Sequence, residues 1–169
     1  MTTTDPQTPL TPPRVGPPKE LVSSTAHLLK RLAWTLKDRT LDAFEETGLS
    51  PYHHAVLVLL EEEPRETQAT IADALGYDRS HLVGLLDELE ERGLVERRRD
   101  PDDRRRQMVS LTPEGRRALT RLRPTVKRLE DDFFAPLDGD ERGRLHALLL
   151  RLASHHDPRY GAGEPKDDS

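Results

Sequence analysis

The chain contains no cysteine, few aromatic residues and no long run of apolar residues. The absence of cysteine excludes disulfides, thiolate metal sites, thiol catalysis and oxidant sensing through a thiol. Aromatic residues make up 4% of the 169 residues, and apolar residues make up 34%, which suits narrow stripes better than one large core. No stretch approaches the roughly 18 apolar residues of a membrane span, and the first residues hold no apolar signal segment. We therefore expect a cytoplasmic protein without a membrane partner, folded as one small domain or as one subunit of a dimer.

Sequence signatures of catalysis and of metal binding are also missing. The chain has no Gly-rich phosphate loop, no H-E-x-x-H and no G-x-S-x-G. Its seven histidines include adjacent pairs, but no two of them have the i, i+4 spacing of a helical metal site. We therefore expect a protein that is not an enzyme and that has no cofactor and no metal site.

The charge of the chain is strongly polarised. The net charge is -5, yet residues 96–128 contain twelve basic residues against five acidic ones, a local charge of +7, and the remainder carries -12. A basic stripe on an acidic protein is typical of a surface that binds a polyanion. A solvated arginine-rich helix face would give the same pattern, so the charge alone leaves both interpretations open.

The sequence pattern is mainly helical between two segments that we expect to be disordered, residues 1–19 and 158–169. Leucines at helical spacing predict a long first helix over residues 20–47, which Gly48 ends. Capping residues and helix breakers then predict five further helices, which begin after Ser50, Thr67, Asp78, Thr112 and Pro136.

The third and fourth helices along the chain, which begin after Thr67 and Asp78, form the first part of a motif. They are short and joined by a turn that contains Gly76, which predicts a helix-turn-helix. Residues 94–99 and 106–111 alternate in polarity on either side of the acidic, proline-containing turn 100–103, which predicts a β-hairpin. The predicted fold is therefore mainly α, with a winged helix-turn-helix over residues 49–112 whose wing is a small β-hairpin.

The first, fifth and last helices carry apolar stripes that the chain has little means of burying alone. In the fifth helix the apolar residues from Leu119 to Phe133 alternate at spacings of 3 and 4, as in a coiled coil. Pro124 within that helix is expected to kink it. A helical dimerisation region built from residues 20–48 and 113–157 would cover these stripes, so we expect a homodimer.

Three motifs that occur in order along the chain resemble those of the MarR family of bacterial transcription regulators. They are the helix-turn-helix residues 67–95, the wing-tip sequence Asp100-Pro101-Asp102-Asp103-Arg104-Arg105, and Val109-Ser110-Leu111-Thr112-Pro113-Glu114-Gly115. The resemblance covers about residues 20–156. It implies a winged-helix homodimer that binds a pseudo-palindromic operator in double-stranded DNA, usually as a repressor that a small molecule releases.

The helix-turn-helix supplies the first set of predicted DNA contacts. The fourth helix is expected to insert its N-terminal turns into the major groove, where Arg79, Ser80 and His81 can donate to bases or phosphates. Thr67 and Gln68 begin the third helix, where free N–H groups and polar side chains can hold a phosphate.

Other residues near this surface allow more than one role. Gly84 on the outward side of the fourth helix would let the DNA approach the backbone closely, although a merely tolerated glycine fits as well. Asp87 would repel phosphates, so we expect it to be solvated. Arg97, Arg98 and Arg99 are expected to contact phosphates or nothing, since consecutive strand residues point to opposite faces.

The wing tip supplies the second set of predicted contacts. A tight acidic turn pushes Arg104 and Arg105 outward, as in a probe of the minor groove. By the family pattern Asp103 orients the tip and Arg105 inserts. The alternative is that Arg105 only pairs with Asp103 within the hairpin.

The resemblance also implies a ligand crevice between the dimerisation helices and the winged-helix lobe. The candidates there combine aromatic rings with cationic groups, which suits a small anionic aromatic ligand. They are Trp34, Lys37, Tyr52, His53, His54 and Arg121. For Trp34 and His54, ordinary packing is the competing explanation.

One alternative function stays open at this point. The winged helix could serve as a protein-interaction module with weak or no specific DNA binding. The net charge of -5 and the residues Val83, Gly84 and Asp87 favour that reading. The basic stretch and the wing-tip motif favour DNA binding.

Overall fold

The computed structural model describes residues 16–101 and 103–161. Contacts divide the chain into two units, residues 1–38 and residues 39–169. The expected disorder of residues 1–15 and 162–169 lies outside the described residues, as does Asp102 of the wing-tip motif.

The N-terminal unit contains a short helix followed by most of a long one. They are α1 (Lys19–Val22) and α2 (Thr25–Glu45). The single helix predicted over residues 20–47 is therefore interrupted at Ser23 and Ser24. The hydroxyl of Ser24 accepts a hydrogen bond from the amide of His27 at 3.2 Å, which satisfies a free N–H group at the start of α2.

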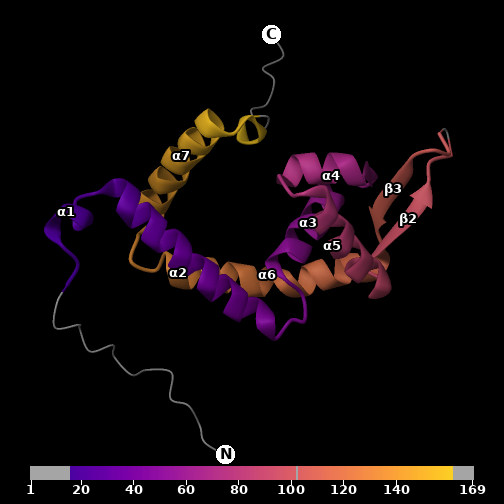
Figure 1. Ribbon diagram of the computed structural model, residues 1–169. Coiled ribbons are helices and arrows are strands. Elements are labelled where there is room, and N and C mark those ends of the chain that lie inside the picture. The colour runs from indigo at the N-terminus through magenta and orange to yellow at the C-terminus, as the bar shows by residue number, and fades with distance from the viewer. Residues whose placement is uncertain (1–15, 102, 162–169) are drawn as a thin grey trace, which may run out of the picture. The chain divides into compact units, whose positions relative to one another are not determined.

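The second unit contains the remaining helices and strands. They are α3 (Pro51–Glu62), β1 (Glu66–Thr67), α4 (Gln68–Leu75), α5 (Arg79–Glu91), β2 (Val95–Arg99), β3 (Gln107–Leu111), α6 (Pro113–Phe133), α7 (Gly139–His156) and the 3-10 helix η1 (Pro158–Tyr160) (Figure 1). The five helices predicted in this unit are all present. The disorder predicted from residue 158 is wrong for η1, where the carboxylate of Asp157 accepts from the amide of Arg159 at 3.1 Å.

The predicted caps begin the helices as expected. Thr67, Asp78 and Thr112 each accept a hydrogen bond from a backbone amide in the first turn. At Ser50 the cap is reciprocal, because the hydroxyl accepts from the His53 amide at 3.2 Å while the Ser50 amide donates to Nδ1 of His53 at 3.0 Å.

The hairpin predicted after the helix-turn-helix is confirmed, and it is part of a three-stranded sheet of order β1-β3-β2. Strands β2 and β3 are antiparallel, in register from Val95 opposite Leu111 to Arg99 opposite Gln107. The additional strand β1 pairs antiparallel with β3. The sequence did not predict β1, since two residues are too few to show alternation.

The core of the second unit joins α3, α4, α5, the sheet and α6. Its fully buried members include Leu57, Leu60, Ile71, Leu86, Leu89, Val109 and Leu119. This core fixes the direction in which α5 and the hairpin face. In Figure 1 the strands β2 and β3 extend away from the helices of this unit.

Helix α6 runs from Pro113 to Phe133 with Pro124 inside it, so the helix continues beyond the proline and the expected kink stays a prediction. Helix α7 buries none of its residues, and its exposed large apolar side chains are Leu148, Leu149, Leu150 and Leu152. Over the described residues, the structure contains no helix long and apolar enough to span a membrane.

Candidate nucleic-acid interface

The N-terminal turn of α5 is exposed and rigidly capped. The carboxylate of Asp78 accepts from the amides of Ser80 at 2.9 Å and His81 at 3.3 Å, and also from the Ser80 hydroxyl. These bonds lower the pKa of Asp78 below its usual value, with the Ser80 hydroxyl as the largest cause. The cap fixes the position of Arg79, whose side chain is exposed. Ser80, by contrast, has its hydroxyl engaged in the cap.

The outward side of α5 is set by its buried leucines Leu82, Leu85, Leu86 and Leu89. Val83 and Gly84 lie on the exposed side. A Cβ atom added to Gly84 would meet no described atom within 4 Å beyond its chain neighbours and the adjacent backbone of α5. Packing within the protein therefore does not require a glycine at this position.

A pocket of about 280 Å³ lies beside this surface. It is lined by Gln68 and Ala69 of α4, Arg79 and Val83 of α5, and Gln107 of β3. The structure thus brings together Gln68 and Arg79, which were predicted separately as DNA contacts. It also adds Gln107, whose exposed place at the outer end of the hairpin could have been found from the strand alternation.

Thr67 is the N-terminal cap of α4 and directly precedes Gln68, which lines this pocket. Its hydroxyl accepts from the Thr70 amide at 3.2 Å and lies 2.6 Å from the Thr70 hydroxyl. The first N–H groups of a helix have no partner within the helix, so this end of α4 suits an anion.

His81 lies in an aromatic cluster that the sequence did not predict. Its ring is 5.2 Å from that of Tyr52 and 5.9 Å from that of Tyr77, and the two tyrosine rings are 5.6 Å apart. All three contacts are edge-to-face, a favourable arrangement for aromatic rings. The residues assigned from sequence to a DNA site and to a ligand site, His81 and Tyr52, are therefore neighbours.

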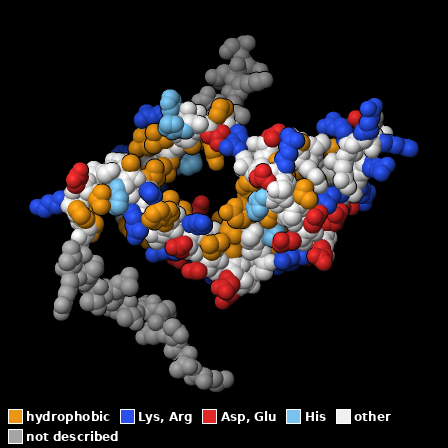
Figure 2. All heavy atoms as spheres, in the orientation of Figure 1, with side chains coloured by type: hydrophobic (Ala, Val, Ile, Leu, Met, Phe, Trp, Pro, Cys, Tyr) orange, Lys and Arg blue, Asp and Glu red, His pale blue; other side chains and the backbone are white. Residues whose placement is uncertain are grey.

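The wing tip holds its backbone in place while its arginine side chains remain in solvent. Oδ1 of Asp103 accepts from the Arg105 amide at 3.1 Å and lies 3.8 Å from Arg105 Nε. The Arg105 side chain is nevertheless 97% exposed. Asp103 therefore orders the turn without covering the guanidinium, and Figure 2 shows Lys and Arg side chains gathered at the end of the hairpin.

One expectation about the charges near α5 is wrong. Asp87 is 58% exposed, as expected, and its Oδ1 also lies 2.6 Å from Nη1 of Arg97. Arg97 does not face a phosphate, because its side chain is only 13% exposed. Arg98, in contrast, has a side chain that is 75% exposed and pairs with Glu96 at 2.8 Å.

The predicted ligand residue His53 is placed inside the winged-helix lobe. Its ring is buried, its Nδ1 accepts from Ser50, and its Nε2 lies 3.2 Å from Oε2 of Glu88. Burial lowers the pKa of His53, although Glu88 acts in the opposite direction. Both ring nitrogens of His53 thus lie near groups of its own lobe, and its predicted ligand role stays a prediction.

The other ligand candidates have separate neighbours. The ring of His54 is 5.7 Å from that of Phe44, and burial, followed by the charge of Arg123, lowers the His54 pKa. Arg121 pairs with Glu114 at 2.9 Å. Adjacent residues of an α-helix point in different directions, so Tyr52, His53 and His54 face different neighbours, and the ligand roles of Tyr52, His54 and Arg121 stay predictions.

In the N-terminal unit, Trp34 is 51% exposed. Lys30 and Arg31 lie over its ring, at 4.9 Å and 5.7 Å from the ring centroid. Lys37 is exposed. The ligand roles of Trp34 and Lys37 stay predictions.

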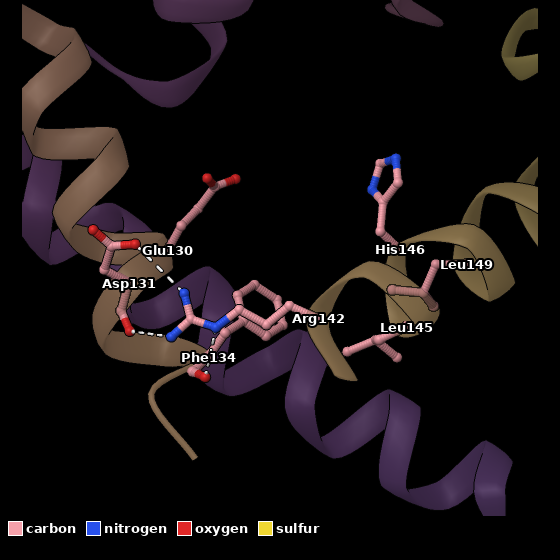
Figure 3. A pocket seen from close by; sticks show the side chains of 7 residues that line it. All are labelled: Glu130, Asp131, Phe134, Arg142, Leu145, His146 and Leu149. Carbon is pink, nitrogen blue, oxygen red and sulfur yellow. Dashed lines mark hydrogen bonds and ion pairs between the residues drawn. The ribbon is translucent and has the colours of Figure 1, made fainter. Parts of the chain in front are cut away.

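Another pocket, of about 310 Å³, lies where α6 meets α7 (Figure 3). Arg142 anchors the turn beside it by donating to the carbonyl oxygens of Phe134 at 3.1 Å and Leu137 at 3.2 Å. Leu145, His146 and Leu149 form its α7 side. None of the predicted ligand residues lines this pocket.

Comparisons with known proteins decide the family. Residues 47–106 match the family model described as MarR family. A putative transcriptional regulatory protein for the hcr operon of Thauera aromatica is 40% identical over 68% of each chain. Among solved structures, the transcriptional repressor CouR bound to a 23-mer DNA duplex is 36% identical, with a TM-score of 0.74 over 80% of this chain and 96% of CouR. CouR of Rhodococcus jostii RHA1 bound to p-coumaroyl-CoA is 32% identical, with a TM-score of 0.71 over 83% of this chain and 97% of CouR.

The chain belongs to the MarR family. It is accordingly a transcription regulator with a winged-helix fold, as its motifs indicated. The MarR resemblance read from the wing tip and the helix-turn-helix is confirmed.

Proposed function

We propose that this MarR-family chain is a ligand-responsive repressor that acts in the cytoplasm and binds a pseudo-palindromic operator in double-stranded DNA as a homodimer. One observation carries the proposal: a capped, exposed helix end and an arginine that is 97% exposed at the wing tip belong to the same unit. That combination suits simultaneous contact with a major groove and the adjacent minor groove. The DNA-bound structure of the similar repressor CouR supports it.

The major-groove contacts come from α5 and the pocket beside it. Arg79 can donate to a guanine, the commonest specific pairing of a side chain with a base. The exposed Gly84 lets the helix backbone approach the base edges. Thr67 and Gln68, at the start of α4, are placed to hold the flanking phosphate through N–H groups and the Gln68 amide.

The minor-groove contacts come from the wing. Arg105 inserts into the groove, where a narrow width strengthens the negative potential, and Arg104 accompanies it. Asp103 keeps the tip in the required turn. Dimerisation through residues 20–48 and 113–157 would place two such lobes on half-sites about one helical turn apart.

The proposal is tested by selecting duplexes from a random DNA pool with the purified protein and, in parallel, with Arg105→Ala. We expect a pseudo-palindrome to be enriched by the native protein, and its affinity to fall at least about tenfold with Arg105→Ala while the dimer stays intact. Phosphate contacts are strongest at low salt. If no sequence is enriched even there, specific DNA binding is refuted and the alternative function, a winged helix that binds a protein partner, is favoured.

The ligand of the proposed repressor is a small anionic aromatic compound. CouR, which is similar over most of this chain, is bound to p-coumaroyl-CoA in one of its structures. Here the partly buried His54 ring beside Phe44, with the positive charge of Arg123 nearby, offers aromatic and cationic chemistry within one unit.

The ligand proposal is tested by titration with p-coumarate and with p-coumaroyl-CoA, which should release the selected duplex from the protein. His54→Ala should weaken release without changing the affinity of the ligand-free protein for DNA. Release that is unaffected by His54→Ala would place the ligand elsewhere.

A further inference from the structure

The strongest unexplained feature of the winged-helix lobe is the environment of Arg97 in the middle of β2. Nη1 of Arg97 lies 2.6 Å from Oδ1 of Asp87 and 3.2 Å from Oε2 of Glu90. The backbone amide of Arg97 also donates to Oε1 of Glu90 at 3.1 Å. Asp87 and Glu90 lie about one turn apart on α5, the helix proposed to enter the major groove and called the recognition helix below. This helix therefore holds β2 through both the side chain and the main chain of Arg97.

Burial makes this attachment different from an ordinary surface ion pair. The Arg97 side chain is 13% exposed, whereas those of Asp87 and Glu90 are 58% and 41% exposed. Nε and Nη2 of Arg97 have no hydrogen-bond partner among the described residues. The carboxylates of Asp87 and Glu90 therefore offset the desolvation cost of the Arg97 guanidinium. Without them the guanidinium would be a buried charge with no partner.

Arg97 is also the last residue of β2 that is not exposed before the wing tip. It follows Val95 by two residues and so shares the inward face of the strand, while Arg98 and Arg99 are exposed. The tip that carries Arg105 begins immediately beyond Arg99. A restraint at Arg97 therefore limits how far the tip can swing relative to α5.

We propose that Arg97 is a positioning residue for DNA recognition: its clamp on Asp87 and Glu90 fixes the wing relative to the recognition helix, so that both engage the same site. The inference rests on the proposed function, because it assumes that α5 and Arg105 contact one duplex. Arg97 itself touches no base or phosphate. By pairing with Asp87 and Glu90 it also offsets two negative charges on the helix that approaches the DNA.

The proposal predicts that Arg97 and Arg105 act together although they do not touch. Distant residues without shared partners normally contribute independently to binding. If Arg97 positions the wing, Arg105→Ala should cost at least about tenfold in affinity in the native background but less than about threefold in an Arg97→Met background. The measurement is a double-mutant cycle on the selected duplex at one salt concentration.

Arg98→Met is the matched control. It makes the same substitution in the same strand at an exposed residue, and the Arg105→Ala penalty there should remain at least about tenfold. Thermal unfolding of each variant checks that it folds. Should Arg97→Met fail to fold, Asp87→Asn/Glu90→Gln removes the clamp from the helix side and should reduce the Arg105→Ala penalty in the same way.

Two results would overturn the inference, and they are distinguishable. An Arg105→Ala penalty that is undiminished in both clamp backgrounds would show that Arg97 does not position the wing, while the proposed function stands. Absence of any Arg105→Ala penalty in the native background would refute wing insertion, and the positioning role would fail with it.

Discussion

His53 shows how a single side chain connects two helices of the winged-helix lobe. Nδ1 accepts from the Ser50 amide at the start of α3, so in the neutral ring the proton lies on Nε2, which is 3.2 Å from Oε2 of Glu88 on α5. Burial lowers the pKa of His53 below its ordinary value of 6.5, which favours this neutral form. The residue that the sequence suggested for a ligand is therefore a structural link beneath the recognition helix.

The lowered pKa values of His53 and His54 predict that acid destabilises the fold. Below about pH 6.5 the unfolded chain takes up protons that the folded chain resists, so stability is full above that pH and falls until the folded pKa is passed. His53→Gln keeps an acceptor for the Ser50 amide but cannot titrate, so it should remove part of the loss. Urea unfolding between about pH 7 and pH 5 measures this difference. An identical pH dependence in His53→Gln would contradict it.

Gly84 makes opposite predictions for folding and for DNA binding. An alanine there meets no neighbour within 4 Å among the described residues, and it should stabilise α5 by about 1 kcal/mol through helix propensity. If the DNA backbone or a base edge approaches this position closely, the same methyl group should weaken operator binding. Thermal unfolding and a DNA titration on Gly84→Ala separate the two effects. A more stable variant with unchanged affinity would show that the glycine is merely tolerated.

At the scale of helices and strands, local signals were enough to predict most of the fold. The caps at Thr67 and Asp78 begin α4 and α5, as the sequence suggested, and α4 ends at Gly76, whose φ angle is positive. The outward side of α5 also followed from the spacing of its leucines. These features depend on neighbours within a few residues.

Features that depend on partners far along the chain could not be predicted in this way. The pairing of Asp87 with Arg97, of His53 with Glu88 and of His81 with Tyr52 arises only when α3, α5 and β2 pack together. Each of these pairs gives a polar or aromatic side chain a partner that its local pattern did not indicate. Which of the site residues are neighbours in space could therefore be seen only in the tertiary structure.

Gly115 at the start of α6 shows why one motif glycine is needed. A Cβ atom there would collide with the carbonyl oxygen of Leu94, which accepts from the Thr112 amide at 3.1 Å where the wing meets α6. Gly115→Ala should therefore destabilise the fold by about 1–3 kcal/mol, the usual cost of overpacking. Gly84→Ala is the matched comparison, since it adds the same methyl group in open space. Urea unfolding of both variants should show opposite shifts, and a neutral Gly115→Ala would show that α6 can move away from Leu94.

At the scale of the whole molecule, the exposed leucines of α7 predict how the two copies associate. Leu148 and Leu152 are one turn apart and are 50% and 52% exposed, and α7 buries none of its own residues. A patch of this kind on a MarR-family chain is expected to be covered by the second copy. Leu152→Glu places a charge in that interface, whereas Leu152→Met conserves volume and apolarity and serves as the control.

We expect Leu152→Glu to shift the protein toward the monomer in light-scattering measurements, and Leu152→Met to remain dimeric. Because each monomer holds only one half-site, Leu152→Glu should also lose more affinity for the full operator than Arg105→Ala, whose dimer is intact. Its affinity for an isolated half-site should stay unchanged, since α5 and the wing lie in other elements. A Leu152→Glu protein that stays dimeric would show that α7 does not hold the copies together through this face.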